Sequence, residues 1–213
     1  MRSRFDEMLK KLKDNLIVMG SLCEECITSA AYALIIGEEK FIEQAVSLEK
    51  EIDSSESFIR HLCMDILLRQ QPVAKDLCLV STAMKLIVDM ERIGDMGRDI
   101  AELSPFFHMA KDLNQNTKMV KHIAKMTEEV CAMLKSSILS FVKEDINLAK
   151  EAVLLDNNVD ELFFKIKDDL VLLICDKKDA GKDILETLMI AKYLERIGDH
   201  SVNIAESVIE LLE

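Results

Sequence analysis

The sequence is poor in the residues that interrupt regular structure. Its 213 residues include only 6 glycines and 2 prolines, and tryptophan is absent. A fold built from many short strands needs frequent turns, which glycine and proline supply. Their scarcity argues against a β-sandwich or barrel and favours long helices. We therefore predict an all-α fold.

Positive charge is also scarce. Lysine and arginine number 27 against 39 aspartates and glutamates, so the formal net charge is −12 at pH 7. A chain with this charge repels the phosphates of nucleic acid and of anionic lipid, so neither is expected as its main partner. The same charge is compatible with divalent cations or with basic surfaces of other proteins.

Membrane-spanning runs and a disulfide pattern are lacking as well. No apolar run is expected to span a bilayer, and the first residues lack the apolar core of a signal peptide. The 6 cysteines have no disulfide spacing, so we expect reduced thiols in a cytoplasmic protein. Cys23 and Cys26 form a C-x-x-C on an apolar face, and we interpret them as core thiols rather than zinc ligands or a redox pair.

What the sequence does contain is an apolar pattern with the helical period along most of its length. The breaks in this pattern are Gly37, Pro72, a polar linker from Pro105 to Asn116, and a turn at Asp179 to Gly181. Asn116 is expected to cap the helix that follows the linker. Six helices are predicted, at about residues 5–36, 41–70, 77–103, 120–141, 145–175 and 184–209.

A pentapeptide, Glu-Arg-Ile-Gly-Asp, occurs twice, at Glu91–Asp95 and at Glu195–Asp199. The tripeptide Ile-Ala-Glu follows each copy at the same distance, at residues 100–102 and 204–206. The second half therefore resembles a diverged copy of the first. Short connections favour antiparallel neighbours, so we predict two tandem three-helix bundles related by a pseudo-twofold axis. The two repeats are assigned to residues 1–106 and 112–213.

Each pentapeptide places a glutamate and an aspartate four residues apart, on one face of a helix. The preceding helix of each repeat carries a second acidic pair with the same spacing. The eight candidate residues are Glu49, Asp53, Glu91, Asp95, Asp156, Asp160, Glu195 and Asp199. If the helices of a repeat pack side by side, four carboxylates converge and repel one another unless a cation or a proton relieves them. Oxygen donors of this kind suit hard cations such as Mg, Mn, Fe or Ca.

The competing interpretation is a solvated acidic face without metal. Long helices carry many exposed acids, and Arg92 and Arg196 are placed to pair with their acidic neighbours. The matched occurrence of the pairs on both helices of both repeats favours a metal site. Gly94 and Gly198 stand between the two acids of each motif, where glycine costs about 1 kcal/mol relative to alanine. They therefore indicate a packing or clearance requirement.

Several spaced motifs resemble those of the PhoU family of phosphate transport regulators, over essentially the whole chain. The segments that carry the resemblance are Arg69–Pro72 with Ala74 and Asp76–Leu77, Asp89–Asp95, Leu194–His200 and Asn203–Glu206. The resemblance implies two three-helix bundles with E(D)-x-x-x-D motifs that bind polynuclear iron or other metals. In this chain those motifs are the four acidic pairs named above, with Fe, Mn, Mg or Zn as candidate ions.

The same resemblance implies a function without catalysis. Proteins of this family regulate phosphate uptake and the phosphate-starvation response negatively, between the phosphate ABC transporter and its sensor histidine kinase. The implied partners are the ATPase subunit of the transporter and the kinase, so contact with the membrane would be through partners only. A homodimer is a further possibility.

The chain departs from the family pattern at Cys78, at Met96 and at Arg98. Arg98 stands where the second repeat has Val202. It is expected to place a positive charge near the first acidic pairs and to lower their affinity for metal, so the two repeats should differ. Two other functions compete with a metal-binding regulator: a metal-free acidic adaptor, and a carboxylate-bridged metalloenzyme. The absence of any E-x-x-H spacing argues against a ferritin-like di-iron oxidase.

Overall fold

All regular structure in the described part of the chain is helical. The computed structural model describes residues 2–109, 117–176 and 181–213. The helices are α1 (Arg2–Ile36), α2 (Glu39–Gln70), α3 (Lys75–Met109), α5 (Thr117–Lys143), α6 (Ile146–Asp176) and α7 (Gly181–Leu212). The predicted all-α fold with one set of three helices per repeat is confirmed.

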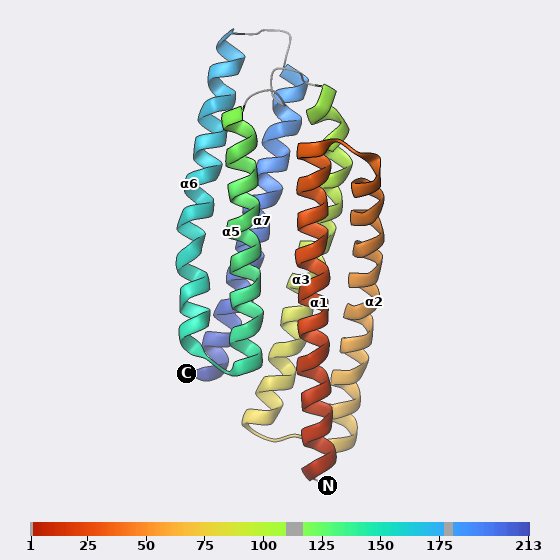
Figure 1. Cartoon of the computed structure of the whole chain (residues 1–213). Coiled ribbons are helices and arrows are strands. Elements are labelled where there is room, and N and C mark those ends of the chain that lie inside the picture. The colour runs from red at the N-terminus through yellow and green to blue at the C-terminus, as the bar shows by residue number, and fades with distance from the viewer. Residues whose placement is uncertain (1, 110–116, 177–180) are drawn as a thin grey trace.

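The helices form two antiparallel three-helix bundles that lie side by side (Figure 1). Helices α1, α2 and α3 pack on one another, as do α5, α6 and α7. Helix α3 also packs along α7, and α1 packs against α5, so the bundles share one continuous set of buried side chains. Burial of these apolar faces is the main stabilising contribution to such a fold.

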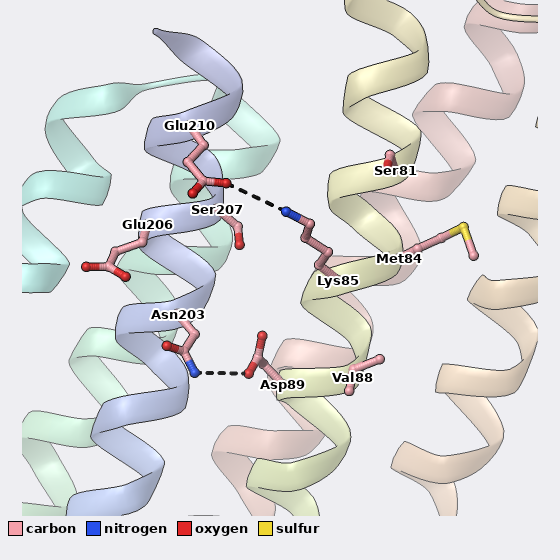
Figure 2. A pocket seen from close by; sticks show the side chains of 9 residues that line it. All are labelled: Ser81, Met84, Lys85, Val88, Asp89, Asn203, Glu206, Ser207 and Glu210. Carbon is pink, nitrogen blue, oxygen red and sulfur yellow. Dashed lines mark hydrogen bonds and ion pairs between the residues drawn. The ribbon is translucent and has the colours of Figure 1, made fainter.

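Contacts across the seam between α3 and α7 are reciprocal. Asp89 of α3 accepts a hydrogen bond from Asn203 of α7 at 3.4 Å, as Figure 2 shows. At the equivalent positions of the opposite repeats, Tyr193 of α7 hydrogen-bonds Asp99 of α3. Asp89 and Tyr193 occupy equivalent positions in the two repeats, and so do Asp99 and Asn203. The same pair of positions therefore makes contact twice, with the roles of α3 and α7 exchanged, as a pseudo-twofold axis requires.

The helix ends follow from local backbone chemistry. Gly37 has a φ of 77°, and its N–H donates to the carbonyl of Ala33 at 3.0 Å, which confirms its role as the stop of α1. Gln71 closes α2 with a left-handed φ of 47°. The carboxylate of Asp145 accepts a hydrogen bond from the backbone N–H of Asn147 at 2.9 Å and so caps α6.

The predicted end of the third helix was wrong. Helix α3 continues through Pro105 to Met109 instead of ending near Leu103. Proline removes one backbone hydrogen bond from a helix interior, but Phe107, only 1% exposed, lies beyond it and its burial favours continuation. Asn114, Asn116 and Asp179, with the linker and turn predicted there, lie outside the described residues, so the repeat boundaries at 106 and 112 stay predictions.

Helix α1 is an exception to the expectation that no segment could span a bilayer. The segment 4–36 meets the length and composition of a membrane span, at a mean hydropathy of 1.2 in its most apolar window. In that window 56% of the residues are buried inside the bundle. A core helix of a helical bundle meets the same criterion, and α1 packs against α2, α3 and α5.

Candidate functional site: two acidic clusters

The fold brings the acidic pairs of neighbouring helices together within each repeat. We call Glu49, Asp53, Glu91 and Asp95, on α2 and α3, the first acidic cluster. We call Asp156, Asp160, Glu195 and Asp199, on α6 and α7, the second acidic cluster. Helices α2 and α3 pack together, as do α6 and α7, so the predicted approach of these helices is confirmed.

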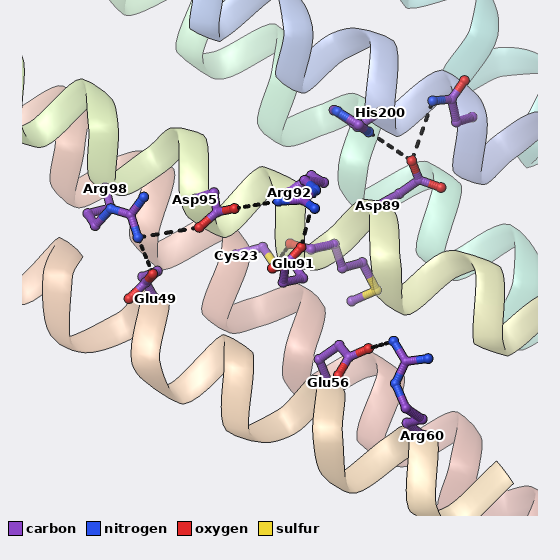
Figure 3. A network of polar contacts seen from close by, with 12 residues as sticks. Cys23, Glu49, Glu56, Arg60, Asp89, Glu91, Arg92, Asp95, Arg98 and His200 are labelled. Carbon is purple, nitrogen blue, oxygen red and sulfur yellow. Dashed lines mark hydrogen bonds and ion pairs between the residues drawn. The ribbon is translucent and has the colours of Figure 1, made fainter. Parts of the chain in front are cut away.

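Two arginines occupy the first acidic cluster (Figure 3). Arg98 of α3 pairs with Glu49 of α2 and lies 3.3 Å from the carboxylate of Asp95. Arg92 pairs with Asp95 at 3.0 Å and with Glu91 at 3.5 Å. Three of the four predicted acids therefore have a guanidinium partner.

The pKa values in this cluster reflect both burial and charge. Burial raises the pKa of Glu91, and the nearby charge of Asp95 raises it further, while Arg92 opposes the shift. Burial alone would lower the pKa of Arg98, but its hydrogen bond to Asp99 and the surrounding carboxylates raise it above the ordinary arginine value. Arg98 therefore stays charged at any pH at which the protein is folded.

The second acidic cluster has a different charge balance. Burial and the charges of Asp160, Asp199 and Glu195 raise the pKa of Asp156 to about 6. Lys192 pairs with Glu195 at 2.5 Å. In the described part of the chain, the three aspartates of this cluster have no ion pair or hydrogen bond, so their repulsion is only partly relieved.

The glycines of the two motifs have different neighbours. A Cβ atom on Gly198 would lie 3.3 Å from a carboxylate oxygen of Asp156, so this glycine leaves room for that side chain. A Cβ on Gly94 would lie 2.9 Å from the Cδ1 atom of Ile52, an apolar contact between α2 and α3. Both glycines are therefore needed for close packing, as predicted. The neighbouring side chain is a carboxylate only in the second repeat.

The two clusters also differ in how well they fit a metal ion. No three histidine, cysteine, aspartate or glutamate side chains among the described residues are arranged as metal ligands. The first acidic cluster does not fit a metal, because Arg98 already bridges its two helices. The second acidic cluster supplies only oxygen donors, and this donor set suits a hard cation.

Two charged residues near the clusters were not among the residues predicted from the sequence. Glu56, one turn beyond Asp53 on α2, contributes to the raised pKa of Glu91 and pairs with Arg60. Lys192 stands three residues before Glu195, a spacing that brings side chains together on a helix. That spacing could have predicted the pairing of Lys192 with Glu195.

The C-x-x-C pair lies in the core, as expected. Cys23 and Cys26 are fully buried, and their thiols donate to the carbonyl oxygens of Met90 at 3.4 Å and Gly94 at 3.7 Å. Burial raises the pKa of Cys26 to about 12. Neutral thiols that are already hydrogen-bonded to backbone carbonyls make poor metal ligands or nucleophiles.

Comparison with known proteins gives matches across nearly the whole chain. A relative from Clostridium acetobutylicum, named phosphate-specific transport system accessory protein PhoU homolog, is 32% identical over 99% of this chain and 95% of its own length. A relative of the same name from Pseudomonas aeruginosa is 30% identical over 98% of this chain and 85% of its own length.

Solved structures agree with these matches. The crystal structure of PhoU from Pseudomonas aeruginosa has a TM-score of 0.88, 30% identity and 98% coverage of both chains. The phosphate transport system regulatory protein PhoU from Streptococcus pneumoniae has the same fold, with a TM-score of 0.85, 24% identity and coverage of 97% and 96%. The PhoU domain model matches residues 16–104 and 123–208, one copy in each bundle. The chain therefore belongs to the PhoU family.

Proposed function

We propose that this protein is an accessory and regulatory component of a phosphate-specific transport system. In this role it restrains phosphate uptake and the phosphate-starvation response while phosphate is plentiful. Relatives of 30–32% identity that extend over nearly the whole chain carry the name of a transport accessory protein. This family membership is the observation that carries the proposal, and the proposed role is binding rather than catalysis.

The proposed partners are the ATPase subunit of the transporter and the sensor histidine kinase, met at the cytoplasmic side of the membrane. The net charge of −12 suits basic protein surfaces and disfavours direct binding to nucleic acid or anionic lipid. Contact with the membrane would then be through partners only. Self-association as a homodimer is compatible with this arrangement.

We further propose that the second acidic cluster holds a metal ion, with Fe, Mn or Mg favoured over Zn because every donor is a carboxylate oxygen. The ion would be held by Asp156 and Asp160 from α6 and by Glu195 and Asp199 from α7. It would supply charge neutralisation and a cross-link between these helices. The repulsion around Asp156, which Lys192 relieves only in part, supports this assignment.

The experiment that tests this role compares variants in cells that lack their own copy of the gene. Asp156→Asn combined with Asp199→Asn should bind less Mn²⁺ than the wild type and should express phosphate-starvation genes in abundant phosphate. Asp168→Asn, at an exposed position of the same helix and outside the cluster, is the matched control and should repress normally. Failure of the wild-type gene to restore repression would contradict the regulatory role itself.

A metal-free adaptor is the second candidate, and the arginine pairing of the first acidic cluster favours it. In that case acids outside the first acidic cluster would meet basic partner surfaces directly. A double variant that folds, loses its metal and still represses normally would support the adaptor and exclude metal from signalling. The two candidates therefore differ in one measurable outcome.

A further inference from the structure

The side chain of Arg98 lies where a metal that bridges α2 and α3 would be needed. It pairs with Glu49 of α2 and with Asp95 at 3.3 Å, as Figure 3 shows. It also pairs with Asp99 at 3.0 Å, so one guanidinium contacts three carboxylates. Glu49 is only 7% exposed, so its charge needs a partner inside the protein. Arg98 supplies that partner from the neighbouring helix.

A guanidinium group performs the same electrostatic task as a bound cation. It is permanently charged, and its planar set of N–H donors can bond several carboxylates at once. A metal ion entering the first acidic cluster would have to displace it or share the same acids with it. Displacement would break the pair with buried Glu49, and sharing would bring two cations together.

The second repeat lacks this cation at the equivalent position. Val202 stands where the first repeat has Arg98, and Asp156, one methylene shorter than Glu49, lies beside Gly198. Lys192 contacts Glu195 alone among the four acids. Among the described side chains of this repeat, no cation pairs with acids of the cluster on both α6 and α7, because Lys192 reaches α6 only at the ring of Phe163.

We infer that Arg98 replaces metal in the first acidic cluster, so that the first repeat is joined by a built-in cation and metal binding is confined to the second repeat. The part that concerns the second repeat rests on the proposed metal function. The part that concerns Arg98 stands on its own contacts. Each chain then has one metal-dependent and one metal-independent helix pair.

The test exchanges the two equivalent residues and titrates Mn²⁺ by isothermal titration calorimetry. Arg98→Val should create a Mn²⁺ site that is absent from the wild type and is removed again by adding Asp95→Asn. Val202→Arg should weaken Mn²⁺ binding at the second acidic cluster at least tenfold. If the double variant Asp156→Asn with Asp199→Asn still binds Mn²⁺ as the wild type does, and Asp95→Asn abolishes that binding, the first acidic cluster binds metal and the inference is overturned.

Melting curves in EDTA test the role of Arg98 even if the second cluster binds no metal. Arg98→Val should lower the melting temperature by about 5 °C, because Glu49 is left buried without a partner. Arg98→Gln, which keeps most of the side-chain volume, should lower it as well. Adding Glu49→Gln to Arg98→Val should recover much of the loss. An unchanged melting temperature for both Arg98 variants would overturn the inference, whatever the metal content of the wild type.

Discussion

Glu49 and Asp156 occupy equivalent positions in the two repeats but have opposite electrostatic surroundings. Glu49 pairs with Arg98, whereas Asp156 is surrounded by three other carboxylates that raise its pKa to about 6. The regular spacing of the acidic pairs was enough to predict that they approach one another on neighbouring helices, whereas their role as metal ligands stays a prediction. The reach of Arg98 across to α2 was not predictable in detail, because it depends on how two helices are rotated against each other.

The surroundings of Asp156 lead to a prediction for the metal-free protein. Asp156→Asn removes one of four mutually repelling charges, so it should raise the free energy of unfolding by about 0.5–1 kcal/mol. The measurement is urea unfolding at pH 7.5 in EDTA, with Asp168→Asn as an exposed control on the same helix. Equal or lower stability of the Asp156 variant would show that the repulsion is already relieved.

At the scale of helices, the apolar period was enough to find the six helices of the described residues, because each buries one continuous face. The end of α3 was missed because burial of Phe107 outweighs the local effect of Pro105, and no local pattern reports that burial. The short distance between α1 and α3 could not be predicted from the sequence either. A Cβ atom on Gly97 of α3 would lie 2.7 Å from the sulfur of Cys26 on α1.

Gly97→Ala should therefore destabilise the protein, although alanine normally stabilises a helix interior by about 1 kcal/mol relative to glycine. The short, fully buried side chain of Cys26 has little room to move, so we expect a net loss of about 1–3 kcal/mol. Gly181→Ala is the control, since nothing lies within 4 Å of its added Cβ. Thermal unfolding of both variants is the measurement, and a stable Gly97 variant would mean that the helices can separate slightly at little cost.

The turn between α5 and α6 is tied to the other bundle by Glu144. Its carboxylate accepts hydrogen bonds from Lys13 of α1 at 3.0 Å and from Lys75 of α3 at 2.7 Å. The bond from Lys75, then that from Lys13, lower the pKa of Glu144 below the ordinary glutamate value. A carboxyl group with a lowered pKa stabilises the folded state above its unfolded pKa and loses that effect as the pH falls through its folded pKa.

Glu144→Gln should consequently lower the melting temperature at pH 7 by about 1–3 °C, because two partly exposed ion pairs are lost. The difference between variant and wild type should shrink as the pH falls below the ordinary pKa of glutamate and should vanish in strong acid. Melting curves from pH 7 to pH 3 would show this. A difference that is independent of pH would indicate that the effect is not electrostatic.

At the scale of the whole molecule, the two repeats are joined by more than a linker. The buried side chains form one cluster that runs through both bundles, and α3 packs along the full seam with α7. The sequence predicted the duplication because the pentapeptide is copied. It contained no comparable signal for the extent of the seam, which depends on side chains such as Tyr193 and Asp99 that differ between the copies.

A shared core predicts cooperative unfolding. Scanning calorimetry of the full chain in EDTA should show a single transition rather than one for each repeat, since opening either bundle would expose the apolar faces of both. Tyr193→Phe and Asp89→Asn, on the seam, should lower the temperature of that transition without splitting it. Two resolved transitions in the wild type would mean that the bundles are independent folding units.

The seam has a consequence for how the two halves could diverge. An internal repeat with reciprocal contacts is the trace left when a gene for one three-helix unit is duplicated and the copies are fused. In a dimer of separate identical units, a substitution such as valine to arginine at the position of Arg98 would appear in both halves at once, and neither half could keep the original residue. Fusion removes that constraint, because each copy then mutates alone. A single chain can thus acquire an arginine in one half while the other half keeps aspartates without a guanidinium partner.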